Sequence, residues 1–111
     1  MSAGTHARWE VGLAAIPPVE RALEGDTLRE TRAFRGLTHE RALGYLENLG
    51  GTVRDPELLE GDGWIARLSS RRVPVGPTYR LTEVTITWEG DPGAVESVIT
   101  RFRIKAFRAP G

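Results

Sequence analysis

Residues 79–90 read YRLTEVTITWEG and form the clearest strand pattern of the chain. β-branched and aromatic residues dominate this stretch and alternate with polar ones, as in a half-buried strand. One face carries Thr82, Val84, Ile86 and Trp88, and the opposite face carries Leu81, Glu83, Thr85 and Thr87. We expect the first face to be buried and the second to be solvated, or covered by the N-terminal tail or by a second subunit.

A helix follows this strand directly. Asp91 is a good N-cap residue, and Pro92 suits the first helical position because no backbone N–H is needed there. Apolar residues then recur at steps of three and four positions, which predicts a helix with one buried face. They are Val95, Val98, Ile99, Phe102 and Ala106.

Another strand and helix lie further upstream. Over residues 28–36 apolar and polar residues alternate, which predicts a strand with Phe34 turned inward. Thr38 is then a good N-cap, and the apolar spacing after it predicts a helix over residues 39–49. Gly50 stands where a left-handed residue commonly ends a helix.

Short strands fill the region between this helix and residue 79. We expect them at 51–54, 57–60 and 64–68, and an extended segment at 73–77 whose prolines restrict it to a sheet edge or a bulge. The resulting order of strand, helix, about four strands and helix predicts an α+β fold. We expect a single antiparallel sheet with two helices on one face, β-α-β(4)-α, similar to TATA-binding-protein-like or helix-grip domains.

The chain divides near residue 29. We expect residues 1–28 to be a poorly ordered N-terminal tail, because the pair Pro17 and Pro18 forces an extended kink. Within the tail, residues 19–23 are expected to form one helical turn. Residues 29–111 are expected to form a single α+β domain, which agrees with the total length of 111 residues.

Composition excludes several classes of protein. The 15 basic and 15 acidic residues balance to zero net charge, and 40% of the residues are hydrophobic, as in a globular domain. Cysteine is absent and the histidines are His6 and His39, so we expect no disulfide, no metal site and no cofactor. No apolar run approaches about 18 residues, so we expect a cytoplasmic protein that does not enter a membrane.

No catalytic residues are predicted. His39 falls in the first turn of a helix without an evident serine or carboxylate partner, so we expect it to be solvated. The Gly-Gly pair at 50–51 follows a helix C-terminus, where the helix dipole repels phosphate. Glu57, Glu60 and Asp62 gather in a turn region, but the pattern holds no two of them in register. We therefore expect a protein without catalytic activity of its own.

Arginine dominates the basic residues, since Lys105 is the single lysine among 15. The guanidinium group binds anions through a planar fork of donors. Arg71, Arg72 and Arg80 flank one bend, and Lys105 and Arg108 lie in a C-terminal segment without acidic residues. We expect these five residues to bind an acidic partner or an anion, the alternative being ordinary surface charges. The zero net charge disfavours nucleic acid as the partner.

Two other functions fit the same pattern. A small ligand would occupy a pocket between the sheet and the second helix, lined by Trp64, Trp88 and Phe102. Alternatively, a homodimer would bury the free face of the sheet and serve as an assembly element.

Short motifs of glycine, aromatic and acidic residues are spread over roughly residues 30–111. They are Phe34-Arg-Gly36, Tyr45-Leu-Glu47, Leu49-Gly-Gly-Thr52, Gly61-Asp-Gly-Trp64, Val75-Gly76-Pro77, Leu81-Thr-Glu-Val84 and Glu89-Gly90. Together they resemble the C-terminal domain of MoaD-related proteins, a small domain linked to molybdopterin (molybdenum cofactor) biosynthesis. None of these motifs is catalytic, because they consist of turns, caps and packing residues.

The resemblance implies a TATA-binding-protein-like fold and a role in molybdopterin biosynthesis. Some relatives attach this domain to ubiquitin-like MoaD, the small molybdopterin synthase subunit that carries sulfur on its C-terminal Gly-Gly. Residues 1–28 are too short for such a domain and the chain ends in Ala-Pro-Gly, so the carrier role itself is not implied. The expected function is a non-catalytic accessory module that docks to a synthase subunit or to a MoaD-like carrier.

Overall fold

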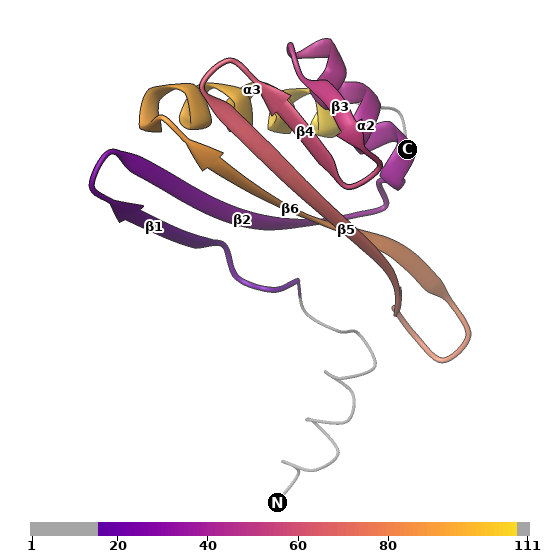
Figure 1. Cartoon of the computed structure of the whole chain (residues 1–111). Helices are drawn as coiled ribbons and strands as arrows, with labels where there is room; N and C mark the ends of the chain where they lie inside the picture. The colour runs from indigo at the N-terminus through magenta and orange to yellow at the C-terminus, as the bar shows by residue number, and fades with distance from the viewer. Residues whose placement is uncertain (1–15, 109–111) are drawn as a thin grey trace, which may run out of the picture.

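A computed structural model describes the backbone of residues 16–108 and the side chains of residues 16–107. Its strands and helices are β1 (Glu20–Glu24), β2 (Thr27–Arg35), α2 (His39–Asn48), β3 (Thr52–Asp55), β4 (Leu58–Gly61), β5 (Trp64–Pro74), β6 (Arg80–Gly90) and α3 (Pro92–Arg108) (Figure 1). The strands form one six-stranded antiparallel sheet in the order β1-β2-β6-β5-β4-β3. This confirms the predicted α+β class and the order of strand, helix, four strands and helix, with β1 as an additional strand.

Both helices pack on the same face of the sheet (Figure 1). Trp88 of β6 and Phe102 of α3 are fully buried there, with ring centroids 5.4 Å apart. Tyr45 of α2 reaches the same phenylalanine at 6.0 Å, so the two helices share one core. The predicted buried face of β6 is confirmed, since Val84, Ile86 and Trp88 are all inaccessible.

The ends of the helices follow the predicted caps. The Thr38 side chain accepts a hydrogen bond from the backbone N–H of Arg41 at 3.1 Å, and Asp91 accepts one from Ala94 at 3.0 Å. At the end of α2, Gly50 has a φ of 104°. The backbone N–H groups of residues 50 and 51 turn back onto the carbonyls of Glu47 and Leu46. These two hydrogen bonds form a Schellman motif, and they satisfy carbonyl groups that have no partner within the helix.

Strands β5 and β6 form a long hairpin whose far end projects beyond the helices (Figure 1). The prediction of a strand at 64–68 and a separate extended segment at 73–77 is wrong, because β5 runs unbroken from Trp64 to Pro74. The prediction that the prolines lie at an edge is confirmed, since β4 stops pairing with β5 at Arg67. Pro74 has no N–H, but at this position β5 has no second neighbouring strand that would need one. We call residues 69–85 the β5–β6 arm.

The predicted helical turn at residues 19–23 is wrong. Residues 20–24 form β1, which pairs with β2 through a tight turn at Gly25, whose φ of 59° is left-handed. The hairpin thus extends the ordered sheet into the segment that we expected to be a poorly ordered tail. The rest of that expectation concerns residues 1–15, which lie outside the described residues.

Glycine is required by the backbone at one position of the sheet and is replaceable at one position of α2. Gly90 has a φ of 152°, and a Cβ built on it would lie 2.2 Å from the carbonyl oxygen of Gly63. Gly44 lies in α2 with no atom within 4 Å of such a Cβ. We expect Gly90→Ala to destabilise the fold by about 2 kcal/mol or more, because of strain and steric overlap. We expect Gly44→Ala to stabilise it by about 0.5 to 1 kcal/mol.

Urea denaturation followed by circular dichroism checks both values. Equal effects of the two substitutions would contradict the close approach of the β4–β5 turn to the end of β6.

Candidate functional site

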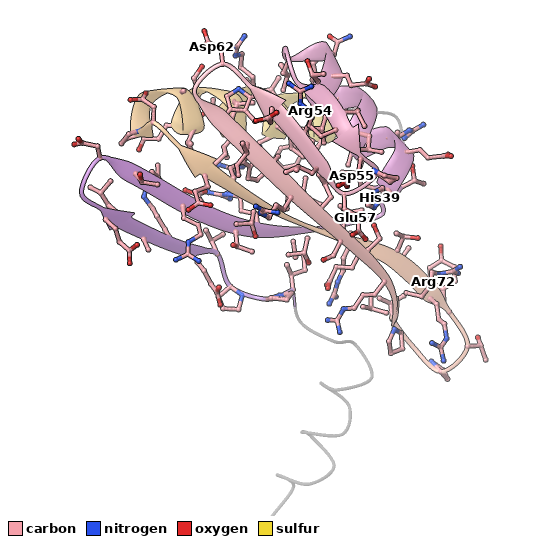
Figure 2. All side chains as sticks on the ribbon, in the orientation of Figure 1. His39, Arg54, Asp55, Glu57, Asp62 and Arg72 are labelled. Carbon is pink, nitrogen blue, oxygen red and sulfur yellow. The ribbon has the colours of Figure 1, made fainter. Side chains whose placement is uncertain are left out.

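The β5–β6 arm holds three of the residues predicted to bind a partner. Arg71 lies on β5 with 67% of its side chain exposed, and its Nε donates to Glu83 at 3.0 Å. Arg72 and Arg80 are exposed further along the arm, and Figure 2 shows Arg72 close to its tip. The Val75 N–H donates to the carbonyl of Tyr79 at 2.9 Å and closes the loop between the strands. The arm therefore displays arginines on a projecting ribbon.

The other two predicted residues lie on a different element. Lys105 is a partly buried residue of the last turns of α3, and Arg108 ends that helix with its side chain outside the described residues. The arm projects away from α3 (Figure 1). The five predicted residues thus belong to two separate surfaces.

The base of the arm contains a buried carboxylate that the sequence pattern did not single out. Glu83 of β6 is 1% exposed, and it accepts hydrogen bonds from Arg35 Nε at 2.9 Å and Arg71 Nε at 3.0 Å. Burial by itself raises the pKa of Glu83, but the hydrogen bonds and charges of the two arginines outweigh it, and the pKa lies below its ordinary value. The negative charge of the Glu83 carboxylate is therefore paired with two guanidinium groups, those of Arg35 and Arg71.

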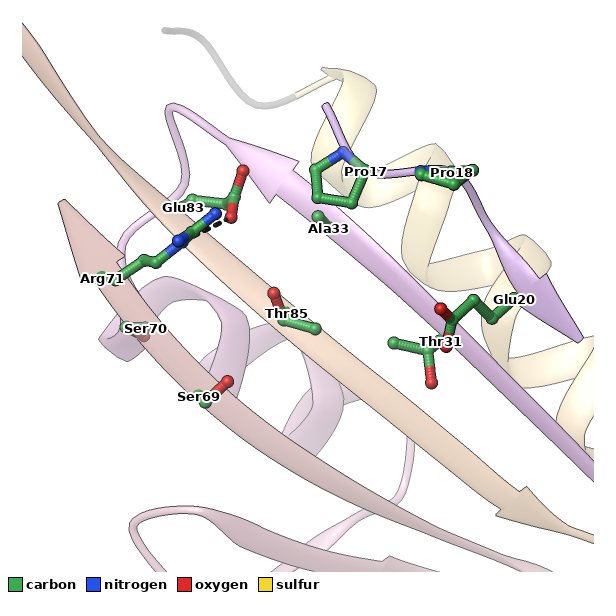
Figure 3. A pocket seen from close by; sticks show the side chains of 10 residues that line it. All are labelled: Pro17, Pro18, Glu20, Thr31, Ala33, Ser69, Ser70, Arg71, Glu83 and Thr85. Atoms are coloured by element: carbon green, nitrogen blue, oxygen red, sulfur yellow. Dashed lines mark hydrogen bonds and ion pairs between the residues drawn. The ribbon is translucent and has the colours of Figure 1, made fainter. Parts of the chain in front are cut away.

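A shallow pocket of about 390 Å³ opens beside this carboxylate on the face of the sheet opposite the helices. Hydroxyl groups from three strands line it, together with Arg71 and Glu83 (Figure 3). Pro17 and Pro18 form its border next to β1. The hydroxyls of Thr31 and Thr87 are hydrogen-bonded to one another at 2.9 Å on this face. The lining thus combines hydroxyl and charged groups with the apolar surface of Pro17, Pro18 and Ala33.

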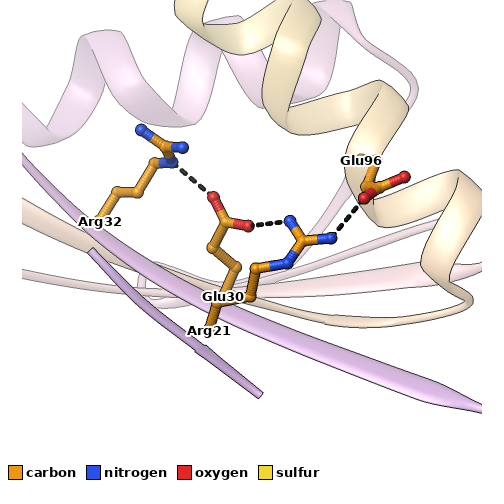
Figure 4. Close-up of polar contacts among 4 residues, drawn as sticks. All are labelled: Arg21, Glu30, Arg32 and Glu96. Atoms are coloured by element: carbon orange, nitrogen blue, oxygen red, sulfur yellow. Dashed lines mark hydrogen bonds and ion pairs between the residues drawn. The ribbon is translucent and has the colours of Figure 1, made fainter. Parts of the chain in front are cut away.

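A second buried carboxylate lies on the helix side of the sheet. Glu30 of β2 is 2% exposed and accepts bonds from Arg21 at 2.7 Å and from Arg32 at 2.6 Å (Figure 4). Arg21 also contacts Glu96 of α3. The bond to Glu96, followed by that to Glu30, raises the pKa of Arg21. This network connects the β1–β2 hairpin to α3.

His39 is partly exposed and has hydrogen-bond partners, one of them a serine, that the sequence did not indicate. Its Nδ1 lies 2.5 Å from Ser70 Oγ, and its Nε2 lies 2.6 Å from the carbonyl oxygen of Pro56. A carbonyl only accepts, so Nε2 carries the hydrogen, and in the neutral ring Nδ1 accepts from the serine. The ring thereby ties the start of α2 to β5 and to the β3–β4 turn.

The acidic residues of the turn region do not converge. Glu57 lies in the β3–β4 turn near His39, whereas Asp62 lies in the β4–β5 turn at the opposite end of β4 (Figure 2). Within residues 16–107, no three His, Asp or Glu side chains are grouped to hold a metal ion. None of the helices in the described part of the chain is long and apolar enough to cross a bilayer.

The predicted ligand pocket between the sheet and the second helix is wrong. Trp88 and Phe102 have no exposed surface and Trp64 is 6% exposed, and all three belong to one hydrophobic core. The rings of Trp88 and Phe102 contact one another and Trp64 belongs to the same core, so the space assigned to a ligand is filled with protein.

One of the two buried carboxylates carries a signal in the sequence. Arg32 stands two residues after Glu30 on the same strand, whereas the partners of Glu83, Arg35 and Arg71, come from the two strands paired with β6. Buried carboxylates require such partners. The register that brings Arg35 opposite Glu83 is visible only in the folded sheet.

Comparison with known proteins gives one family. No curated protein matches the chain. The family model described as "Archaeal MoaD-like protein" matches residues 30–111, which is about three quarters of the chain and includes every strand and helix except β1 and the first three residues of β2. The matched residues contain both buried carboxylates, the β5–β6 arm and both helices. The chain therefore belongs to the archaeal MoaD-like protein family.

Proposed function

We propose that this protein is a non-catalytic accessory module of molybdopterin biosynthesis that docks to a synthase subunit or to a sulfur carrier. The observation that supports it most directly is membership of the MoaD-like family, which suggests an association with molybdopterin biosynthesis or a carrier-like role. The docking role and the absence of catalysis go beyond that association and belong to the proposal.

The β5–β6 arm is the surface proposed to meet the partner. Its exposed arginines project from the body of the domain, where a partner can reach them without displacing core residues. Exposed charges at the rim of an interface act mainly on the rate of association and on specificity. Lys105 and Arg108, on the separate surface at the end of α3, are proposed as a second contact with the same partner.

The test is the full chain carrying Arg72→Glu and Arg108→Glu together. We expect the amount of partner recovered with this variant to fall about tenfold. Its thermal unfolding is expected to stay cooperative, because surface charges contribute little to stability. The measurement is a pull-down of the tagged chain from its own cell extract, with molybdopterin synthase subunits quantified by mass spectrometry. Recovery is expected to fall in about 0.5 M salt, which screens exposed charges.

A matched control has Arg29→Glu and Arg101→Glu, which change the net charge equally at two exposed positions outside the proposed surface. Equal loss in both variants would reduce the proposal to a general charge effect. Absence of synthase subunits from the wild-type pull-down would contradict the proposed function, and light scattering would then test a homodimer. Loss of the cooperative melt would assign Arg72 and Arg108 a structural role.

A further inference from the structure

An apolar groove lies where the end of β2 and the segment after it meet the last turns of α3. Its volume is about 580 Å³, and its apolar surface comes from Phe34, Leu37, Ala106 and Phe107. Phe107 is 86% exposed, which makes it the most exposed large hydrophobic side chain of the described residues. We call this the β2–α3 groove. Apolar surface gathered in one place marks a site where another chain segment or molecule binds.

The charges at the rim do not select a charged occupant. Arg32 donates to the buried Glu30 at 2.6 Å, and Arg35 donates to the buried Glu83 at 2.9 Å. These pairs neutralise two of the arginines that line the groove, and Arg41 is also engaged in a contact. The groove therefore selects its occupant by apolar surface and not by charge.

The chain itself enters the groove at the first described residue. Ile16 lines the groove, is 55% exposed and is preceded directly by residues 1–15. Pro17 and Pro18 follow it. Because proline fixes its own φ and restricts the residue before it, the direction in which the chain leaves the rim is limited. Residues 1–15 therefore start at the groove, whereas any other molecule has to diffuse to it.

The composition of residues 1–15 suits an apolar groove. Trp9, Val11 and Leu13 are large apolar residues at alternating positions, and the one arginine and one glutamate of the segment balance in charge. Trp9 stands seven residues before Ile16, and an extended chain of that length spans up to about 23 Å. Such a short tether gives an effective concentration in the millimolar range, about enough for a weak apolar contact to form.

We infer that residues 1–15 fold back over the β2–α3 groove of their own chain, with the indole ring of Trp9 packed on Phe34 and Phe107. The segment covers this apolar surface in the free protein, and a partner reaches the surface only by displacing the segment. The inference does not rest on the proposed function, because none of the described groove residues belongs to the β5–β6 arm.

Other arrangements agree less well with these observations. The pocket on the open face of the sheet is an alternative site for the segment, but hydroxyl and charged side chains make up much of its lining. A second copy or a separate partner is an alternative occupant of the groove, but neither is tethered at its rim. Attachment at Ile16 therefore favours the segment of the same chain.

Tryptophan fluorescence of the full chain tests the inference. Trp64 and Trp88 are buried in the core, so Trp9 is the tryptophan whose environment depends on the groove. Subtracting the signal of Trp9→Phe from that of wild type isolates Trp9. We expect its emission to be blue-shifted relative to a peptide of residues 1–15, and its quenching by acrylamide to be about threefold weaker, at every protein concentration.

Two variants of α3 locate the contact. Phe107→Asp is expected to restore the quenching of Trp9 to that of the peptide, because it places a charge on the apolar surface while an exposed position leaves the core intact. Ile104→Asp is the matched control, since Ile104 is an exposed apolar residue of the same helix that does not line the groove. It is expected to leave the quenching unchanged.

A measurement on the wild-type chain covers the case in which Phe107→Asp fails to fold. Nuclear Overhauser effects between the indole protons of Trp9 and the ring protons of Phe107 are expected, because the proposed contact brings the two rings together. Their absence would overturn the inference.

The fluorescence results distinguish the other arrangements. Quenching of Trp9 in the full chain that equals that of the peptide would leave the groove uncovered by this segment. Protection that persists in Phe107→Asp would place the segment elsewhere on the domain, and protection that appears only with rising protein concentration would assign the groove to a second copy. Each of these results contradicts the inference. The pull-down through the arm is a separate readout, so failure of the proposed function leaves the Trp9 result standing.

Discussion

Replacing Trp88 with alanine is expected to lower the free energy of unfolding by about 3 to 5 kcal/mol, the largest loss from any single substitution considered. Trp88 has no exposed surface and lies in the middle of the sheet, on β6. Its ring contacts Phe34 at 6.2 Å and Phe102 at 5.4 Å, both edge to face. The substitution leaves a cavity between the sheet and α3 that rigid strands cannot close.

Trp88→Phe is the matched control. The indole N–H of Trp88 has no hydrogen-bond partner among the described residues. Phenylalanine removes that buried donor and keeps an aromatic ring, so we expect a loss of about 1 kcal/mol or less. Urea denaturation followed by circular dichroism measures both variants. A loss below about 1 kcal/mol for alanine would contradict the central position of this side chain in the core.

The second large effect is expected at Glu83. Glu83→Gln keeps the size of the side chain but removes the charge shared by Arg35 and Arg71. We expect a loss of about 2 to 4 kcal/mol, somewhat below the usual value for a broken buried pair because Arg71 is largely exposed. Glu89→Gln, on the same strand and without an ion pair among the described residues, is expected to change stability by about 0.5 kcal/mol or less.

At acidic pH, the difference in the free energy of unfolding between wild type and Glu83→Gln is expected to disappear. Because the pKa of Glu83 is lowered by folding, its contribution is complete above the ordinary glutamate pKa of about 4.3 and is lost as the pH falls through the lower folded value. The gap between wild type and variant should therefore be constant near neutral pH and shrink below about pH 4. A gap that does not depend on pH would mean that packing, and not charge, accounts for the loss.

These two residues differ in how visible they are in the sequence. Trp88 stands in an alternating run whose buried face is readable without a structure, and Val84 and Ile86 follow the same rule. Glu83 stands on the opposite face of the same run, where the pattern predicts a solvated residue. It is buried because Arg35 from β2 and Arg71 from β5 close over it from both sides.

The same division applies to the proposed sites. The sequence predicts that Arg71, Arg72 and Arg80 flank one bend, and all three lie on the β5–β6 hairpin, because residues near one turn of a hairpin lie close together. Lys105 and Arg108 are predicted on the last helix and lie on α3, and the sequence does not show how that helix is placed relative to the arm.

The sequence by itself determined the local elements of this protein and the family to which it belongs. Periodicity identified β2, β6 and both helices, and the residues at Thr38, Gly50 and Asp91 marked the helix ends, because these signals act within a few positions of the chain. Only the tertiary structure decided which charges are buried and which surfaces remain open. Those properties depend on strand register, which brings together residues that lie far apart in the sequence.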